Sequence, residues 1–383
     1  MHRTKVVFIQ RQFSHYRKPV FDKLSDEYEF YLLHGGVEST IEEGKAGYAI
    51  KIDFFKYGRK PTNVFLFVFK RLIKIKAKIL VHEANPSILS LPFTFVLCKI
   101  MKTKFVLWGH GYNRSKGFYL NLKLRIRLLF MKMADAVVFY DYRTKEIISN
   151  YIDEKKLFVA LNTINTYEFI SLKNQYDKIG KDKIKSKLGF LAKYNMLFIG
   201  RLIPEKKTIE AIKTFIEIKE KMCQASINIH IIGDGPLKKD VESFVIKNNL
   251  EQFVRIHGAI YDEKELSKIL YISDLVINPG YVGLNVNHAY CFNIPIFTFN
   301  QGKYGPFHSP EIEYVKNFET GFFAEPYNYS QLADLIIKYL SDKELQETIY
   351  YNIEHLIKNK ITIDNMLDGF RECFDYLKPK PIK

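Results

Sequence analysis

The 383-residue chain lacks several features that would place it in a membrane or secreted class. The uncharged stretch at residues 84–98 contains two prolines and is shorter than the ~20 apolar residues that span a bilayer. The first residues, MHRTKVVFIQRQF, lack the uninterrupted apolar segment of a signal peptide. We therefore expect a protein that stays in the cytoplasm, either soluble or peripheral on the inner face of the cell membrane.

Cysteine is also scarce. The four cysteines lie far apart and form no CxxC pair, which argues against a zinc knuckle or a disulfide framework. They are Cys98, Cys223, Cys291 and Cys373. We expect all four to be reduced.

Positive charge is abundant. The formal net charge is +16 and the pI is near 9.3, which calls for a polyanionic partner such as nucleic acid, an anionic membrane or a phosphorylated substrate. No nucleic-acid-binding module with basic and aromatic residues on one face is present, so we expect no nucleic-acid partner. Basic residues alternate with apolar ones at helical spacing in part of the first half, a pattern typical of a membrane-surface face. They are Lys70, Arg71, Lys74, Lys76, Lys78, Lys99, Lys102, Lys104, Lys123, Arg125, Arg127 and Lys132.

Short β-branched or aromatic runs alternate with longer helical segments along the whole chain, which predicts an α/β protein with two doubly wound parallel sheets. The predicted strands are VVFIQ, FYLLHG, KILVHEA, KFVLWGHG, AVVFY and LFVALNT in the first half, then NMLFIG, INIHIIG, VRIHG, LVINPG and IPIFTF. We expect a first domain at 1–170, a linker at 171–190 and a second domain at 191–342. Residues 343–383 are expected to be helical and to pack across both domains.

Ligands of such sheets bind at the loops that follow the strands. In GRLIPEKK, Arg201 and Lys206 follow Gly200 and precede a helix start, where free N–H groups already favour an anion. This pattern fits a diphosphate cradle, although a solvated basic loop would look the same. In IIGDGPL, Gly233 and Gly235 allow a sharp turn, but the spacing does not complete GxGxxG, which disfavours a dinucleotide dehydrogenase.

Two further loops contain a histidine. In NPGYVGLNVNH, Gly280 and Gly283 precede a short helix from about Leu284, and we expect the helix start to expose backbone N–H groups to an anion. His288 lies about one turn into that helix and fits either a ligand contact or a buried core histidine. His110 lies between two glycines just past a strand, where it could contact a ligand or pack in a tight turn.

Taken in order, these segments resemble the retaining glycosyltransferase family 4, whose members have the two-domain GT-B fold. GRLIPEKK, IIGDGPL, VRIHGAIYDEKELSKILYISDLVINPG and Asn162 in VALNTIN match that family's motifs, and FVLWGHG resembles a branch that builds bacterial surface polysaccharides, lipopolysaccharide included. The resemblance implies that Arg201 and Lys206 hold the donor phosphates and that His110 faces the donor sugar. These three residues would be the catalytic ones. The donor site it implies comprises Gly200, Arg201, Lys206, Gly233, Gly235, Gly280, Gly283, Leu284, His288 and Glu311.

The chain departs from the family at one motif. The family's paired glutamates, which have seven residues between them, align with Gly280 and His288, so both carboxylates are missing. A neutral histidine accepts one hydrogen bond from a ribose, whereas a carboxylate accepts two. Glu311 is then the best remaining carboxylate near the donor, unless it serves only as an acid at a helix start.

The resemblance implies transfer of a sugar from a nucleoside diphosphate sugar, with retention, to a saccharide acceptor that we expect to be lipid-linked. No DxD-like pair lies on a strand-end loop, so we expect no metal and no cofactor beyond the donor. Two alternatives stay open: a non-catalytic sugar-nucleotide-binding partner in a polysaccharide assembly, and another GT-B enzyme such as an epimerase. The base, the sugar and the linkage cannot be read from the sequence.

Overall fold

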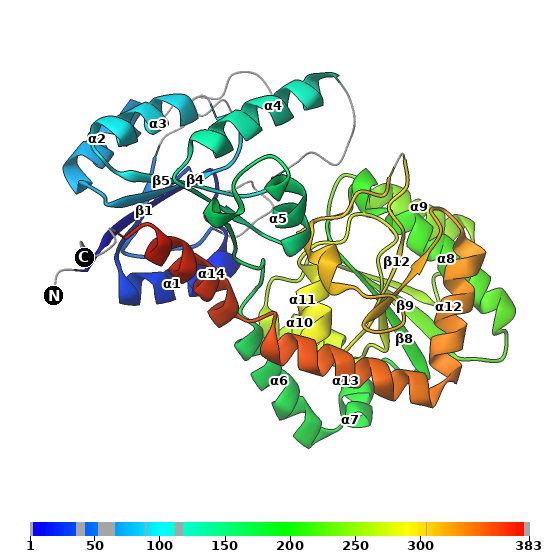
Figure 1. The fold of residues 1–383 in the computed structure, drawn as a ribbon. Helices are drawn as coiled ribbons and strands as arrows, with labels where there is room; N and C mark the ends of the chain where they lie inside the picture. The colour runs from blue at the N-terminus through cyan, green and yellow to red at the C-terminus, as the bar shows by residue number, and fades with distance from the viewer. Residues whose placement is uncertain are drawn as a thin grey trace. The chain divides into compact units, whose positions relative to one another are not determined.

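The computed structural model describes residues 3–35, 43–52, 66–88, 90–111, 118–303 and 305–378 (Figure 1). Its contacts divide the chain into two compact units. The first unit comprises the chain up to Asn165 and again from Ile363, and the second comprises Thr166–Thr362. Each unit contains one parallel β-sheet with helices on its faces.

The first sheet has seven strands in the order β3-β2-β1-β4-β5-β6-β7. Their bounds are β1 Lys5–Gln10, β2 Glu29–His34, β3 Ala49–Lys51, β4 Ile79–Glu83, β5 Lys104–Trp108, β6 Ala136–Phe139 and β7 Leu157–Val159. Successive residues of β1 point to opposite faces, because side chains alternate along a strand. Val6 and Phe8 lie in one buried cluster, and Val7 and Ile9 lie in the other.

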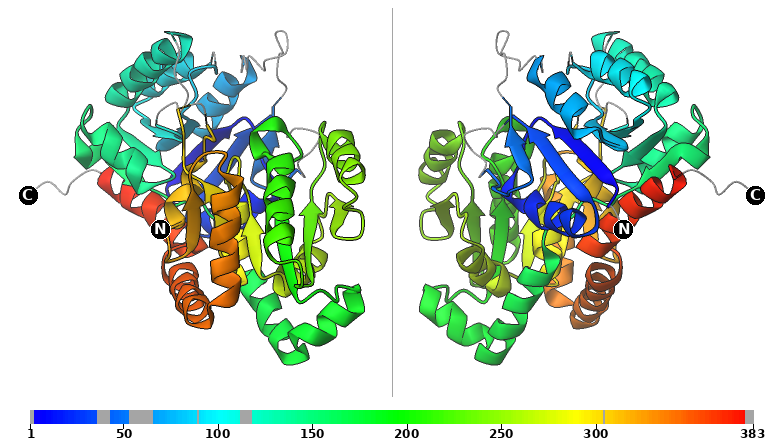
Figure 2. Two further views of the ribbon diagram at one scale, coloured as in Figure 1. Left: turned by 90° about the vertical axis from the view of Figure 1, so that its right-hand side faces the viewer. Right: turned by 90° about the vertical axis from the view of Figure 1, so that its left-hand side faces the viewer.

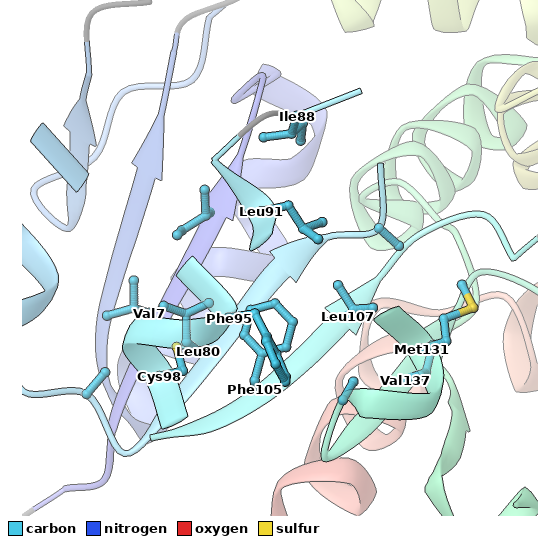
Figure 3. Close-up of a cluster of buried hydrophobic side chains, with 14 of the residues drawn as sticks. Val7, Leu80, Ile88, Leu91, Phe95, Cys98, Phe105, Leu107, Met131 and Val137 are labelled. Atoms are coloured by element: carbon cyan, nitrogen blue, oxygen red, sulfur yellow. The ribbon is translucent and has the colours of Figure 1, made fainter. Parts of the chain in front are cut away.

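Helices cover the two faces of this sheet. The cluster that contains Phe8 is closed by α1, Lys18–Glu27, and by α14, Ile363–Tyr376. The opposite cluster lies beneath α2, Leu66–Ile75, α3, Leu91–Ile100, α4, Phe118–Met133, and α5, Tyr142–Ser149 (Figures 2 and 3). On that face Phe95 packs edge-to-face on Phe105, with ring centroids 5.4 Å apart. The helices α2, α3 and α4 therefore each have one side turned to the sheet and one turned away from it.

The second sheet has six strands in the order β10-β9-β8-β11-β12-β13. The strands are β8 Tyr194–Ile199, β9 Ile227–Ile232, β10 Val254–Gly258, β11 Leu275–Ile277, β12 Ile296–Phe299 and β13 Gly321–Ala324. The helices of this unit are α6 Thr166–Ile179, α7 Lys181–Leu188, α8 Thr208–Lys221, α9 Lys238–Lys247, α10 Glu263–Ile272, α11 Asn285–Cys291, α12 Tyr329–Ser341 and α13 Lys343–Asn359. Short 3-10 helices are η1 His15–Arg17, η2 Glu154–Lys156, η3 Pro204–Lys206 and η4 Pro310–Tyr314.

Two doubly wound parallel sheets were predicted, and the structure confirms them. Every predicted strand is present, whereas β3 and β13 were not foreseen. Residues 171–190, expected as a linker, lie in α6, α7 and the residues around them within the second unit. The expected C-terminal helical segment is two helices assigned to different units: α13 packs on α11 and α12, and α14 packs on β7 and α1. The segment NVFLFVFKRLIKIKAK, residues 63–78, has the periodicity of a helix, and its start lies outside the described residues.

A membrane-spanning helix was not expected. Within the described ranges, every helix is too short or too polar to cross a bilayer.

Candidate functional site

The strand order of the second sheet reverses at β8, which has β9 on one side and β11 on the other. Such a switch point separates the loops that follow neighbouring strands and opens a place for a ligand at the carboxyl ends of the strands. The loops after β8, β9, β11 and β12 carry most of the residues that the sequence singled out. These loops form the candidate site.

The turn after β8 is held against the turn after β9 by close backbone packing. A Cβ atom on Gly233 would lie 1.9 Å from the carbonyl oxygen of Gly200, and one on Gly235 would lie 2.5 Å from that of Leu202. Only glycine fits at these two positions. Gly200 lies close to the Lys206 side chain, because a Cβ added to Gly200 would lie 3.3 Å from Cε of Lys206. The predicted glycines thus place the Lys206 side chain across the end of β8.

The loop after β11 packs on the same turn. The N–H of Tyr281 donates to the carbonyl oxygen of Glu205 at 2.7 Å, and Nζ of Lys206 donates to the carbonyl oxygen of Tyr281 at 2.7 Å. A Cβ on Gly280 would lie 2.3 Å from the Glu205 oxygen. Gly280 aligns with a glutamate of the resembled family, and this packing leaves no room there for any side chain.

Lys206 is the electrostatic centre of the site. Burial of its ammonium group lowers the pKa to about 8, with the nearby Arg201 cation acting in the same direction and the Glu311 carboxylate opposing both. Glu311 is buried at the start of η4, whereas Arg201 is exposed. A lysine with a lowered pKa gains from any added negative charge, because an anion would stabilise its charged form.

The helix start at Gly283 differs from the expectation. The N–H of Gly283 donates to Oδ1 of Asn285 at 2.9 Å, so it is not exposed to an anion as predicted. Leu284 caps α11 without a side-chain hydrogen bond, and the helix has only seven residues. A Cβ on Gly283 would nevertheless face Oγ of Ser309 at 3.7 Å and Nζ of Lys206 at 3.8 Å. Gly283 therefore lies beside the ammonium group, where a Cβ would make only ordinary contacts, rather than supplying a donor.

Two polar residues that were not predicted from the sequence, Ser309 and Asn278, lie on the same loops. Oγ of Ser309 and Oδ1 of Asn278 are buried and make no hydrogen bond among the described residues. The loop that carries Ser309 is fixed because its N–H donates to the carbonyl oxygen of Val282 at 2.9 Å. The N–H of Val282 in turn donates to Nδ1 of His308 at 3.3 Å, and Nε2 of His308 donates to Phe299 at 2.9 Å. Serine and asparagine after strands are too common to be singled out from the sequence.

His288 lies on α11 and is partly buried. Its Nδ1 lies 3.0 Å from the carbonyl oxygen of Leu284, which can only accept a hydrogen bond. The neutral ring therefore carries its proton on Nδ1 and presents Nε2 as an acceptor. The ring packs edge-to-face on Phe169 of α6 at 5.0 Å. The contacts with Leu284 and Phe169 give His288 a packing role in the fold. Its Nε2 also provides the single hydrogen-bond acceptor expected of a neutral histidine.

His110 belongs to the first unit and lies just past β5. A Cβ on Gly109 would lie 3.3 Å from Cβ of Ala84, and one on Gly111 would lie 2.4 Å from Thr144. The two glycines therefore pack inward and leave His110 exposed, with its ring 5.1 Å from that of Tyr140. Asn162, in the same unit, is buried and donates its N–H to the carbonyl oxygen of Tyr140 at 3.2 Å.

The second unit thus brings together the ammonium group of Lys206, the buried carboxylate of Glu311 and the buried Oγ of Ser309 at the carboxyl ends of its strands. The ammonium and the hydroxyl suit a phosphate-bearing ligand, because both can donate hydrogen bonds to oxygen anions. Arg201, Gly200 and Gly283 lie close to Lys206. Gly233, Gly235 and Gly280 position the loops from behind.

The known proteins that resemble this chain are glycosyltransferases. Residues 180–356, which lie in the second unit, match the family described as "Glycosyl transferases group 1". An uncharacterized glycosyltransferase of Methanocaldococcus jannaschii is 24% identical over 88% of this chain and 89% of its own length. The capsular polysaccharide biosynthesis glycosyltransferase CapM of Staphylococcus aureus is 23% identical over 67% of this chain and 66% of its own length.

Solved structures share the fold of the whole chain. A glycosyltransferase from Rickettsia africae superimposes with a TM-score of 0.74 at 16% identity, covering 99% of this chain and 100% of that one. Anabaena HepE in complex with UDP superimposes with a TM-score of 0.70 at 14% identity, covering 97% and 100%. The fold is therefore that of the GT-B glycosyltransferases.

Proposed function

We propose that the chain is a retaining, metal-independent glycosyltransferase that moves a sugar from a nucleoside diphosphate sugar to a lipid-linked saccharide during surface polysaccharide or lipopolysaccharide synthesis. Its donor diphosphate is held in the second unit by Lys206 and Arg201. The observation that carries this proposal is the Lys206 ammonium, buried with a lowered pKa beside Gly283 and Ser309 at the carboxyl ends of the strands. The capture of UDP by a protein of the same fold supports a nucleoside diphosphate.

The chemistry follows from charge. The leaving diphosphate gains negative charge as the bond to the sugar breaks, and a preorganised cation stabilises that state more than the bound donor. Lys206 is positioned before the ligand arrives, because its Nζ is already held by the Tyr281 carbonyl at 2.7 Å. The exposed Arg201 supplies the second cation. His110 is assigned to the donor sugar from the family resemblance.

A non-catalytic sugar-nucleotide-binding role is the second candidate. Gly280 and His288 stand where the resembled family has two glutamates, and the packing of Gly280 on Glu205 excludes a carboxylate there. Such a protein would bind the donor but would not turn it over.

One experiment separates these functions. Purified protein is screened by thermal shift against UDP, GDP, TDP and CMP sugars, and the release of nucleotide is then measured with each donor that stabilises the fold. We expect a diphosphate donor to bind and to be hydrolysed slowly without acceptor. The CMP sugar, with one phosphate, is the matched control. Binding without any release would favour the non-catalytic role, and no binding by any donor would contradict both.

A further inference from the structure

Helices α2, α3 and α4 lie over one face of the first sheet (Figures 1 and 2). The side of these helices turned away from the sheet is unusually apolar for an exposed surface. Among the described residues, twelve large hydrophobic side chains other than tyrosine are exposed, and eight of them lie on these three helices. They are Ile73, Phe93, Val96, Ile100, Leu122, Ile126, Leu129 and Met133. Scattered exposed hydrophobics are normal, whereas a concentration of this kind marks an interaction surface.

The helical spacing makes these side chains into stripes. On α3 the buried Phe95 and Cys98 face the sheet (Figure 3), while Phe93, Val96 and Ile100 repeat at intervals of three and four residues on the opposite side. Phe93 is 65% exposed and Ile100 is 73% exposed. Residues three and four apart lie on the same side of a helix, so both sides of α3 are apolar.

The longer helix α4 repeats this arrangement. Its four exposed hydrophobics are spaced by four, three and four residues, which gives one continuous stripe along the helix. They are Leu122, Ile126, Leu129 and Met133.

The charge of the same helices is of one sign. None of α2, α3 and α4 contains an aspartate or a glutamate. Their basic residues are Lys70, Arg71, Lys74, Lys99, Lys123, Arg125, Arg127 and Lys132. Lys99 is paired with Asp135, at 3.2 Å, just beyond α4. Arg71, Lys74, Arg125 and Lys132 are exposed and stand beside the apolar stripes.

We propose that this surface, the exposed side of α2, α3 and α4, is the face with which the protein docks on an anionic lipid bilayer, its apolar stripes entering the interface and its cations meeting the lipid headgroups. Apolar side chains on one side of a helix together with flanking Lys and Arg are what an anionic interface binds. A second copy of the chain fits poorly, because it would bring cations against cations. This inference rests on the proposed function only for the reason why the protein would dock, which is to reach a lipid-linked acceptor.

The test uses tryptophan as a depth probe, since the native Trp108 is buried and gives a constant background. Phe93→Trp is compared with Tyr351→Trp in the second unit, where Tyr351 is 67% exposed. Vesicles of phosphatidylcholine and phosphatidylglycerol, with and without brominated chains, are added to the intact protein without donor. We expect a blue shift and bromine quenching for Phe93→Trp alone. Equal quenching of both probes, or of neither, overturns the proposal.

A second pair of variants separates insertion from charge attraction. Phe93→Ser with Ile100→Ser should lower the vesicle partition coefficient by about tenfold or more at both low and high salt, because two large apolar groups are lost. The matched control, Leu191→Ser with Ile246→Ser, removes equally exposed side chains of the second unit and should leave it unchanged. Lys70→Glu, Arg71→Glu and Lys74→Glu together should weaken binding mainly at low salt, compared with Lys187→Glu, Lys247→Glu and Lys360→Glu.

A protein partner predicts a different outcome. If Phe93→Trp shifts to the blue without vesicles as the protein concentration rises, the surface binds another copy, and the membrane proposal is wrong. Because no donor is present, failure to bind vesicles would leave the transferase proposal standing. Failure of turnover would likewise leave the docking surface standing.

Discussion

Nζ of Lys206 and the carbonyl oxygen of Tyr281 are joined by a 2.7 Å hydrogen bond that links the loops after β8 and β11. This bond holds a buried ammonium group beside Gly283 and Ser309 before any ligand is bound. A cation fixed in advance does not have to be reoriented when charge develops on a leaving group. The following predictions test the site built around it.

Lys206→Ala should lower turnover by about a hundredfold, because removal of one preorganised group that stabilises transition-state charge costs about 3 kcal/mol. Arg201→Ala should act in the same direction. Lys207→Ala is the matched control, since Lys207 is the next residue and its Nζ lies 3.9 Å from Glu210. The rate of nucleotide release and the unfolding temperature are measured together. Near-wild-type turnover of both site variants would mean that the diphosphate binds elsewhere.

The donor reaction should weaken at alkaline pH. The lowered pKa of Lys206, about 8, means that its charge is lost as the pH rises through that value. The rate at low donor concentration should then fall up to about tenfold per pH unit above it. Because the Glu311 carboxylate raises the Lys206 pKa, Glu311→Gln should move this fall to lower pH. A pH profile that Glu311→Gln leaves in place would show that Lys206 is not the titrating group.

The two glycines of the loop after β11 should respond differently to alanine. Gly280→Ala places a Cβ against the Glu205 backbone and should cost about 1–3 kcal/mol of stability. Gly283→Ala meets only ordinary contacts, at 3.7 Å and beyond, so stability should be kept while the donor Michaelis constant rises. Denaturant unfolding and donor titration distinguish the two. Equal stability of both variants would contradict the packing described for Gly280.

His288 should be replaceable by glutamate if it contacts the donor. His288→Ala should raise the donor Michaelis constant and also remove the edge contact with Phe169, worth about 1 kcal/mol. His288→Glu should restore donor affinity in part, because a carboxylate accepts the same hydrogen bond. Equal loss of stability in both variants with no change in donor affinity would identify His288 as a packing residue.

The second unit should lose stability in acid. Burial lowers the pKa of His230 to about 3 and that of His257 to about 4, and the two rings are joined by a 3.1 Å hydrogen bond. Below pH ~6.5 the unfolded chain binds protons that the folded chain excludes, so stability is lost as the pH falls. His230 alone should account for a loss of about 3 kcal/mol by pH ~4.5, two pH units below the unfolded value. Urea unfolding at pH 7 and 4.5 measures it, and His257→Gln should reduce the difference.

The sequence alone determined the two parallel sheets, because buried parallel strands read as short apolar runs between amphipathic helices. It also indicated the loops that carry Arg201, Lys206 and Gly283, because the strand runs before them end at or near glycine, whereas Glu311 came from the family resemblance. The helices α6 and α7 were mistaken for a linker. Lysine-rich helices that bury only part of one side carry little periodic signal.

Tertiary structure alone determined the contacts between the loops and which side of each first-unit helix is buried. The close approach of the Gly280 backbone to Glu205 and the buried Oγ of Ser309 depend on loops that follow three different strands, β8, β11 and β12. Helical spacing predicted basic amphipathic helices in the first half, but a sequence does not reveal which of two apolar sides faces the sheet. Only the packed fold shows that Phe95 is buried and Phe93 exposed, because burial is set by neighbours distant in the chain.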